Sequence, residues 1–221
     1  MEKSHLHIGI LELGERTTAF YLYQLNKQYA PFSEEDKCPI IVHNVDFDTL
    51  NTYLPNSFKK LESLLSEQIE KVEALGVDYL LIPNITLHET FDRLKTNINI
   101  AHPVQLTINQ LIEKKQTQAV VFASLHTMES TYLKNAFQQK GIELIEPTKE
   151  DKYFIEYIRT QVYNEQETDD EVEKYSLLLA AYSKKQPVLI ACTELSILIS
   201  TSQNNIFDMA QTQIEETLQQ L

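Results

Sequence analysis

Val188-Leu189-Ile190-Ala191-Cys192-Thr193-Glu194-Leu195 is the stretch that decides the fold. Its apolar first half predicts a buried parallel strand, and the polar residues that follow predict a turn into a helix. The stretch Tyr79-Leu80-Leu81-Ile82-Pro83-Asn84-Ile85-Thr86-Leu87-His88 has the same build. The sequence therefore predicts two related halves with matching strand ends, of which one carries Cys192 and the other carries Asn84.

Strands and helices alternate outward from these two stretches. Apolar runs predict strands at 6–11, 39–43, 77–83, 119–123, 142–145 and 188–191. Helical spacing predicts helices near 16–29, 58–75, 88–95, 104–114, 128–140, 150–164, 168–184 and 206–218. Gly76 and Gly141 each follow a predicted helix and are expected to end it. This alternation is typical of parallel sheets covered by helices.

The repeated pattern predicts an α/β protein with two similar lobes, each a parallel sheet flanked by helices. The first lobe is expected to contain residues 1–102 and the last helix, 206–221, and the second lobe residues 103–205. Ligands of open parallel sheets bind beyond the carboxyl ends of the strands. We therefore expect an active-site cleft between the lobes, lined by the turns that follow the strands.

The charge balance argues against two classes of partner. The chain has 19 Lys and Arg residues against 32 Asp and Glu, for a net charge of -13. Nucleic acids and anionic membranes need a field of positive charge that this chain does not supply. A small anion is still compatible with it, because a helix N-terminus can hold one locally.

Cysteine usage and the hydropathy pattern indicate a compartment. Cys38 and Cys192 are the two cysteines, too few for a disulfide framework, and they fit a reducing environment. Neither a secretory signal nor an apolar run near the ~20 residues of a membrane span is found. A cytoplasmic location is therefore expected.

Three residues at the strand ends have open interpretations. Cys192 at a strand-to-helix turn could transfer protons if the helix N-terminus lowers its pKa, or it could be a buried small hydrophobe. Asn84 could cap the following helix or contact a substrate. Arg16 could bind a carboxylate with both nitrogens of its fork, or it could pair with Glu12 or Glu15.

Four segments of the chain carry a resemblance when they are taken in order. They are His7-Ile8-Gly9-Ile10-Leu11 with the following Gly14, Ile82-Pro83-Asn84-Ile85-Thr86-Leu87-His88, Ala123-Ser124-Leu125-His126-Thr127-Met128-Glu129-Ser130-Thr131-Tyr132 and Ala191-Cys192-Thr193-Glu194-Leu195. Over nearly the whole chain, their order and spacing resemble the cofactor-independent aspartate/glutamate racemases. The last segment is the most specific match.

The resemblance implies a fold, a chemistry and a set of roles. Two α/β lobes would hold a small carboxylate between two thiols, one removing the α-proton and the other returning a proton on the opposite face. No metal and no organic cofactor would be needed. Cys192 would be one proton-transfer residue, and Thr86, Thr127 and Thr193 would bind the substrate. Family members are often dimers, so a homodimer is an expected assembly.

The departures from the family pattern bear on the activity. Asn84 stands at the position of the first thiol, and an amide does not usefully transfer protons near neutrality. His126 replaces a glycine and could transfer a proton or merely fill the pocket. Three interpretations stay open: His126, His88 or a water supplies the second proton of a racemase; a single thiol serves a decarboxylase or isomerase; or the protein binds a small carboxylate without turnover.

Overall fold

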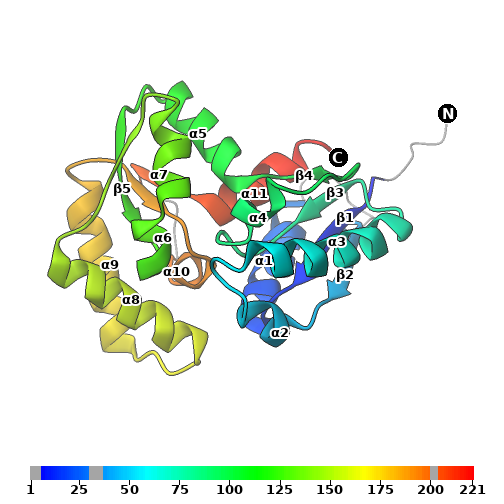
Figure 1. Cartoon of the computed structure of the whole chain (residues 1–221). Helices are drawn as coiled ribbons and strands as arrows, with labels where there is room; N and C mark the ends of the chain where they lie inside the picture. The colour runs from blue at the N-terminus through cyan, green and yellow to red at the C-terminus, as the bar shows by residue number, and fades with distance from the viewer. Residues whose placement is uncertain (1–5, 30–36, 200–203) are drawn as a thin grey trace. The chain divides into compact units, whose positions relative to one another are not determined.

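Two parallel sheets of four strands each form the framework of the chain (Figure 1). The computed structural model describes residues 6–29, 37–199 and 204–221. The chain divides into two compact units, Met1–His102 with Gln213–Leu221 and Pro103–Thr212, and each unit contains one sheet. The predicted α/β class, with parallel sheets flanked by helices, is confirmed.

The first unit has its strands in the order β2-β1-β3-β4, all parallel. These strands are β1 (Ile8–Glu12), β2 (Ile40–Asn44), β3 (Tyr79–Leu81) and β4 (Asn99–Ile100). Its helices are α1 (Glu15–Tyr29), α2 (Phe47–Asn51), α3 (Phe58–Ala74), α4 (His88–Phe91) and the C-terminal part of α11 (Met209–Leu218). Gln213 of α11 is anchored within this unit, because it accepts a hydrogen bond from the Tyr21 hydroxyl at 2.7 Å and donates one to the Ala101 carbonyl at 2.6 Å.

The second unit repeats the strand order as β6-β5-β7-β8, again all parallel. Its strands are β5 (Gln118–Phe122), β6 (Glu143–Ile145), β7 (Val188–Ile190) and β8 (Ile206–Asp208). Its helices are α5 (Pro103–Glu113), α6 (Leu125–Glu129), α7 (Thr131–Gln138), α8 (Lys149–Tyr163), α9 (Asp169–Ser183) and α10 (Thr193–Ile197). Among the described residues, no helix has the length and apolar character that crossing a membrane requires.

Two predicted helices differ from the structure. The expected helix 206–218 begins only at Met209, because Ile206–Asp208 pairs with β7 as β8, so residues 206–212 lie with the second unit and not the first. The expected helix 128–140 is two helices, α6 and α7. Ser130 separates them in an extended conformation, and its hydroxyl caps α7 by accepting from the Leu133 N–H at 3.3 Å. The first difference arises in a short apolar run whose local pattern fits either state, and the second arises at a serine that caps the next helix.

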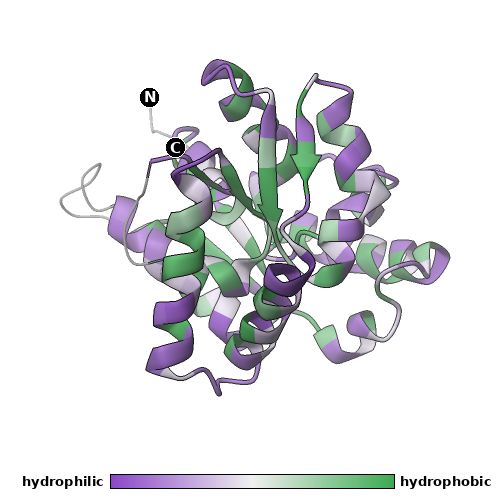
Figure 2. Ribbon diagram, turned by 90° about the vertical axis from the view of Figure 1, so that its left-hand side faces the viewer, coloured by the Kyte–Doolittle hydropathy of each residue, from purple (hydrophilic) through white to green (hydrophobic). Residues whose placement is uncertain are grey.

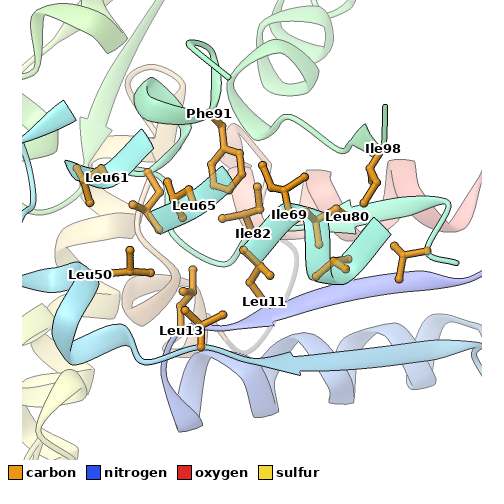
Figure 3. Close-up of a cluster of buried hydrophobic side chains, with 14 residues drawn as sticks. Leu11, Leu13, Leu50, Leu61, Leu65, Ile69, Leu80, Ile82, Phe91 and Ile98 are labelled. Carbon is orange, nitrogen blue, oxygen red and sulfur yellow. The ribbon is translucent and has the colours of Figure 1, made fainter. Parts of the chain in front are cut away.

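Helix α3 shows how the first core forms. Its buried side chains recur at helical spacing, which gives the helix one apolar face. That face is Leu61, Leu65, Ile69 and Val72. Figure 3 shows Leu61, Leu65 and Ile69 of this face near buried side chains of the strands, of the turn after β3 and of α4, among them Leu11, Leu80, Ile82 and Phe91. Figure 2 shows the same division across the chain, with hydrophobic residues concentrated in the strands and mixed colouring on the helices.

Two glycines end helices as the sequence predicted. Gly76 follows α3 with φ of +74°, and Gly141 follows α7 with φ of +76°. Residues with a Cβ rarely adopt this left-handed conformation, whereas glycine does so without a steric penalty.

His88 is a fully buried histidine in the first turn of α4, which follows β3. Its Nε2 lies 3.3 Å from the Ile82 carbonyl oxygen, and its ring packs edge-on against His102 at 4.6 Å between centroids. His102 in turn lies 3.1 Å from the Asp92 carboxylate. The pKa of His88 is lowered to about 3, mainly by burial and further by electrostatic interaction with His102. The hydrogen bond to the Ile82 carbonyl and the charge of Asp92 raise this pKa, but by less. His88 is therefore neutral at physiological pH, and its burial argues against a role as the second proton donor.

We predict that Gly9→Ala destabilises the protein by about 2 kcal/mol, a typical value for overpacking a core. An added Cβ would lie 2.7 Å from Val77 Cγ1 and 3.3 Å from Leu80 Cδ1, and the β-branched Val77 cannot turn away without strain. Urea unfolding of Gly9→Ala, Val77→Ala and the double variant measures this. The two losses should be strongly non-additive, because Val77→Ala makes room for the new methyl group. Additive losses would contradict the steric account.

We also predict that His88 destabilises the folded state in mild acid. The unfolded chain takes up a proton near the ordinary pKa of 6.5, whereas folded His88 resists it down to about 3. The free energy of unfolding should therefore fall by roughly 1.4 kcal/mol per pH unit below ~6 on this account alone. Unfolding of His88→Gln between pH 7 and pH 5 should show a shallower slope than the unsubstituted protein.

Phe91→Leu is the matched control for this experiment. It disturbs the same core without removing a titrating group, so it should lower stability and retain the slope. If His88→Gln and Phe91→Leu show the same dependence on pH, His88 is not the source of the acid sensitivity.

Candidate functional site

The candidate residues of the second unit lie at one edge of its sheet. Strands β5 and β7 are parallel neighbours, with Phe122 opposite Ile190. The segment 124–127 follows β5 and Cys192 follows β7, so both begin at the carboxyl end of the sheet. This is where ligands of open parallel sheets bind.

Cys192 is partly exposed and begins helix α10. Its backbone is extended, and its carbonyl oxygen accepts from the N–H groups of Leu195 at 3.1 Å and Ser196 at 3.2 Å. Its thiol donates to the Glu194 carboxylate, with 2.9 Å between Sγ and Oε2. The turn thus fixes the sulfur beside an acceptor for its proton.

The pKa of the Cys192 thiol is shifted in the opposite direction to the one that the helix N-terminus led us to expect. Burial raises the pKa of Cys192 well above its ordinary value, and the negative charge of Glu194 and the hydrogen bond to it raise it further. The positive charge of Arg159 and the Leu195 N–H act in the opposite direction but do not prevail. The expected lowering by the start of the helix is therefore outweighed, and at neutral pH Cys192 is a protonated thiol with a carboxylate beside it.

Segment 124–127 forms a tight turn at the start of α6. The Ser124 hydroxyl accepts from the Thr127 N–H at 3.2 Å and donates to the Thr127 hydroxyl at 3.0 Å. Thr127 is 5 % exposed and Thr193, which follows Cys192, is 4 % exposed. His126 is exposed in the first turn of α6. The structure thus brings Thr127, Thr193 and Cys192 to one edge, with both threonines largely covered.

The remaining predicted residues share the corresponding edge of the first unit. Arg16 lies half-buried in the first turn of α1 after β1, and Asn84 and Thr86 lie half-buried after β3, the parallel neighbour of β1. The Asn84 side-chain oxygen accepts from the Leu87 N–H at 3.1 Å. The N-cap residue of α4 is Leu87, and no side chain caps the helix, so Asn84 stabilises the turn before α4 and does not cap α4 itself.

Sequence reasoning assigned no role to several residues near Cys192. Glu194 lay in the matched motif, but its contact with the thiol became visible only once the turn was formed. Asp208 accepts from the Ser196 hydroxyl at 2.8 Å, and finding it required β8, which the sequence had suggested to be helical. Arg159 and Glu156 form a pair three residues apart on α8. In sequence, such a pair is typical of a solvated helix face.

Metal binding finds no support in these surroundings. In the parts of the chain that the structure describes, no cluster of three or more His, Cys, Asp or Glu side chains could hold a metal ion. Cys38, the other thiol, is buried and free, and burial raises its pKa to about 11.

Several solved structures share this fold. A Yersinia pestis protein provisionally named an Asp/Glu racemase aligns with a TM-score of 0.83 at 17 % identity, over 97 % of this chain and 98 % of its own. An aspartate racemase homologue from Pyrococcus horikoshii gives 0.79 at 15 % identity, over 97 % and 98 % of the two chains. The aspartate racemase of Picrophilus torridus gives 0.77 at 17 % identity, over 97 % and 94 %.

At these identities the structural likeness establishes the fold alone. No curated protein matches the sequence closely enough to add a relative. The family model described as Asp/Glu/Hydantoin racemase, however, matches residues 8–217. Because that match spans nearly all of the sequence, the chain belongs to the Asp/Glu/hydantoin racemase family.

Proposed function

We propose that the protein is an enzyme that transfers a proton at the carbon next to a carboxylate in a small aspartate- or glutamate-like substrate. Cys192 is the proton-transfer residue of this proposal. The observation that carries it is the 2.9 Å contact between the Cys192 thiol and the Glu194 carboxylate at the carboxyl edge of the sheet. Family membership supports the substrate class.

The pair Cys192 and Glu194 can act in both directions of such a reaction. As an acid, the neutral thiol gives its proton to a carbanion, the S–H bond breaks, a C–H bond forms and a thiolate remains. As a base, the thiol first passes its proton to Glu194, and the resulting thiolate removes the α-proton of the substrate. Total charge is conserved in both steps, so Glu194 stores the proton that Cys192 must lose or regain.

The other proposed roles follow the predicted site. Thr127 and Thr193, and in the first unit Thr86, Asn84 and Arg16, are proposed substrate contacts. His126 is the proposed second proton donor, because it is exposed and close in sequence to Thr127. Independence of cofactors, a cytoplasmic location and a homodimer stay predictions.

A one-thiol reaction is the second candidate, and two observations favour it. Burial is the main cause of the raised pKa of Cys192, so the thiol carries its proton before substrate binds. Asn84, at the position of the family's first thiol, has its side-chain oxygen engaged by Leu87. Decarboxylation or isomerisation by protonation from one face would need one thiol only. A homologue that binds carboxylates without turnover is the third candidate.

The proposed function predicts deuterium uptake at the α-carbon. L- and D-aspartate and L- and D-glutamate are incubated with the protein in D2O, and mass spectrometry and chiral chromatography follow label and configuration. Exchange with inversion indicates a racemase, and exchange with retention indicates one-sided transfer. Cys192→Ser should abolish exchange, whereas Cys38→Ser should retain it. No exchange with any of the four amino acids would contradict the proposed substrate class.

Asn84→Cys extends this experiment to the missing thiol. If the rest of the site is that of a racemase, the variant should gain inversion over the unsubstituted protein, since it restores a second proton-transfer group. Unchanged inversion would indicate that residues other than Asn84 limit the chemistry.

Glu194→Gln should make Cys192 more reactive at neutral pH. Removing the negative charge should lower the pKa of the thiol, so the pH midpoint of its alkylation should fall and the rate near pH 7.5 should rise. Iodoacetamide labelling in a Cys38→Ser background, followed by mass spectrometry, measures both. Glu113→Gln, which removes an exposed carboxylate at the end of α5, is the control. A slower reaction of Glu194→Gln would show that Glu194 activates the thiol and does not restrain it.

A further inference from the structure

Arg159 lies on the helix that covers the carboxyl edge of the second sheet. Helix α8 packs against both α6 and α10, the helices that begin after β5 and β7 (Figure 1). Glu156, one turn before Arg159, holds α8 to that edge, because its Oε2 accepts from the Leu125 N–H at 2.7 Å. The turn of α8 that carries Arg159 is therefore fixed beside the segments that contain Thr127 and Cys192.

The guanidinium group of Arg159 forms hydrogen bonds on the side that carries Nε and Nη2. Nε and Nη2 donate to Glu156 Oε1 at 3.1 Å and 2.5 Å, and Nη2 also donates to the Thr160 hydroxyl at 3.1 Å. Nη1 forms no hydrogen bond with any residue that the structure describes. The side chain is 21 % exposed, so part of it is open to solvent. A guanidinium held on one side with a free nitrogen on the other is arranged to receive a carboxylate.

The charge of Arg159 acts on the proposed reaction centre. It opposes the effect of burial on the pKa of Cys192, and it interacts in turn with the charges of Cys192 and Glu194. The lysines Lys134 and Lys152 of this unit are already paired, Lys134 with Glu146 and Lys152 with Glu129 and Glu146. Arg159 thus combines a nearby positive charge with open donors, in surroundings that are otherwise acidic.

We propose that Arg159 binds a carboxylate of the substrate through Nη1 and thereby makes the site selective for small dicarboxylates over monocarboxylates. The inference rests on the proposed function for the class of ligand, and it assigns a residue that determines specificity. Thr127 and Thr193 would hold one carboxylate and Arg159 the second. Glu156 keeps its bond to the Leu125 N–H and fixes the guanidinium, while its charge competes with the incoming anion.

Protection of Cys192 from alkylation tests the assignment without requiring turnover. Iodoacetamide labelling of the full chain with Cys38→Ser is measured at pH 9 with increasing succinate, or with butyrate as the monocarboxylate of equal chain length. Succinate should protect at concentrations at least tenfold lower than butyrate. In Arg159→Gln the succinate concentration for half-protection should rise at least tenfold, and in Arg159→Lys by less. Protection is expressed as a ratio within each variant, because Arg159→Gln also slows labelling by itself.

Two further variants separate binding from structure. Glu156→Gln keeps an acceptor for the Leu125 N–H and removes the competing charge, so succinate should protect it at equal or lower concentration. Arg93→Gln, which removes a surface arginine of the first unit paired with Glu89, should behave like the reference protein. Loss of protection in Glu156→Gln as in Arg159→Gln would mean that the pair only supports the fold, and it would overturn the proposal.

The outcomes also distinguish this inference from the proposed function. If succinate protection depends on Arg159 but neither aspartate nor glutamate exchanges deuterium, the role of Arg159 in carboxylate binding is supported and the proposed proton-transfer activity is contradicted. If Arg159→Gln exchanges deuterium with an unchanged KM and succinate protects it as before, the proposed activity is supported and the role of Arg159 in carboxylate binding is overturned. Equal protection by succinate and butyrate, or no protection by either, also overturns it.

Discussion

Parallel strand pairing is the constraint on which the candidate site depends. Because β5 and β7 run in the same direction and in register, the turns that follow them begin at the same edge of the sheet. Thr127 and Cys192 are far apart in sequence and are brought to one edge by that pairing alone. Parallel sheets need helices on their faces, and α8 is the helix that brings Arg159 and Glu156 to this edge.

The state of the thiol is decided by a competition in which burial is the larger effect. The N-terminus of a helix favours a thiolate, but α10 has only five residues, and the N–H groups of Leu195 and Ser196 donate to the Cys192 carbonyl. A carboxylate 2.9 Å from the sulfur adds a charge that opposes a second negative charge. The result is a thiol that is protonated at neutral pH, which is the state that the proposed proton donor requires.

The same sequence also shows where local patterns mislead. The first-unit helix α3 was predicted within a residue of its end, because its apolar side chains recur at helical spacing and Gly76 stops it. Ile206–Asp208 was predicted as helix, because a short apolar run has no decisive period and only pairing with β7 makes it a strand. Helix α2 was missed, since it has five residues and too few turns to show a pattern.

The functional features can likewise be divided into those that the sequence determined and those that the tertiary structure decided. The order of the motifs, the single thiol at the second strand end and the amide at the first were determined by the sequence alone, because they are matters of residue identity and spacing. The partner of that thiol, the direction of its pKa and the open side of the Arg159 guanidinium were decided by tertiary structure. These properties depend on burial and on distances of a few ångströms between side chains of different elements, which no local pattern of residues encodes.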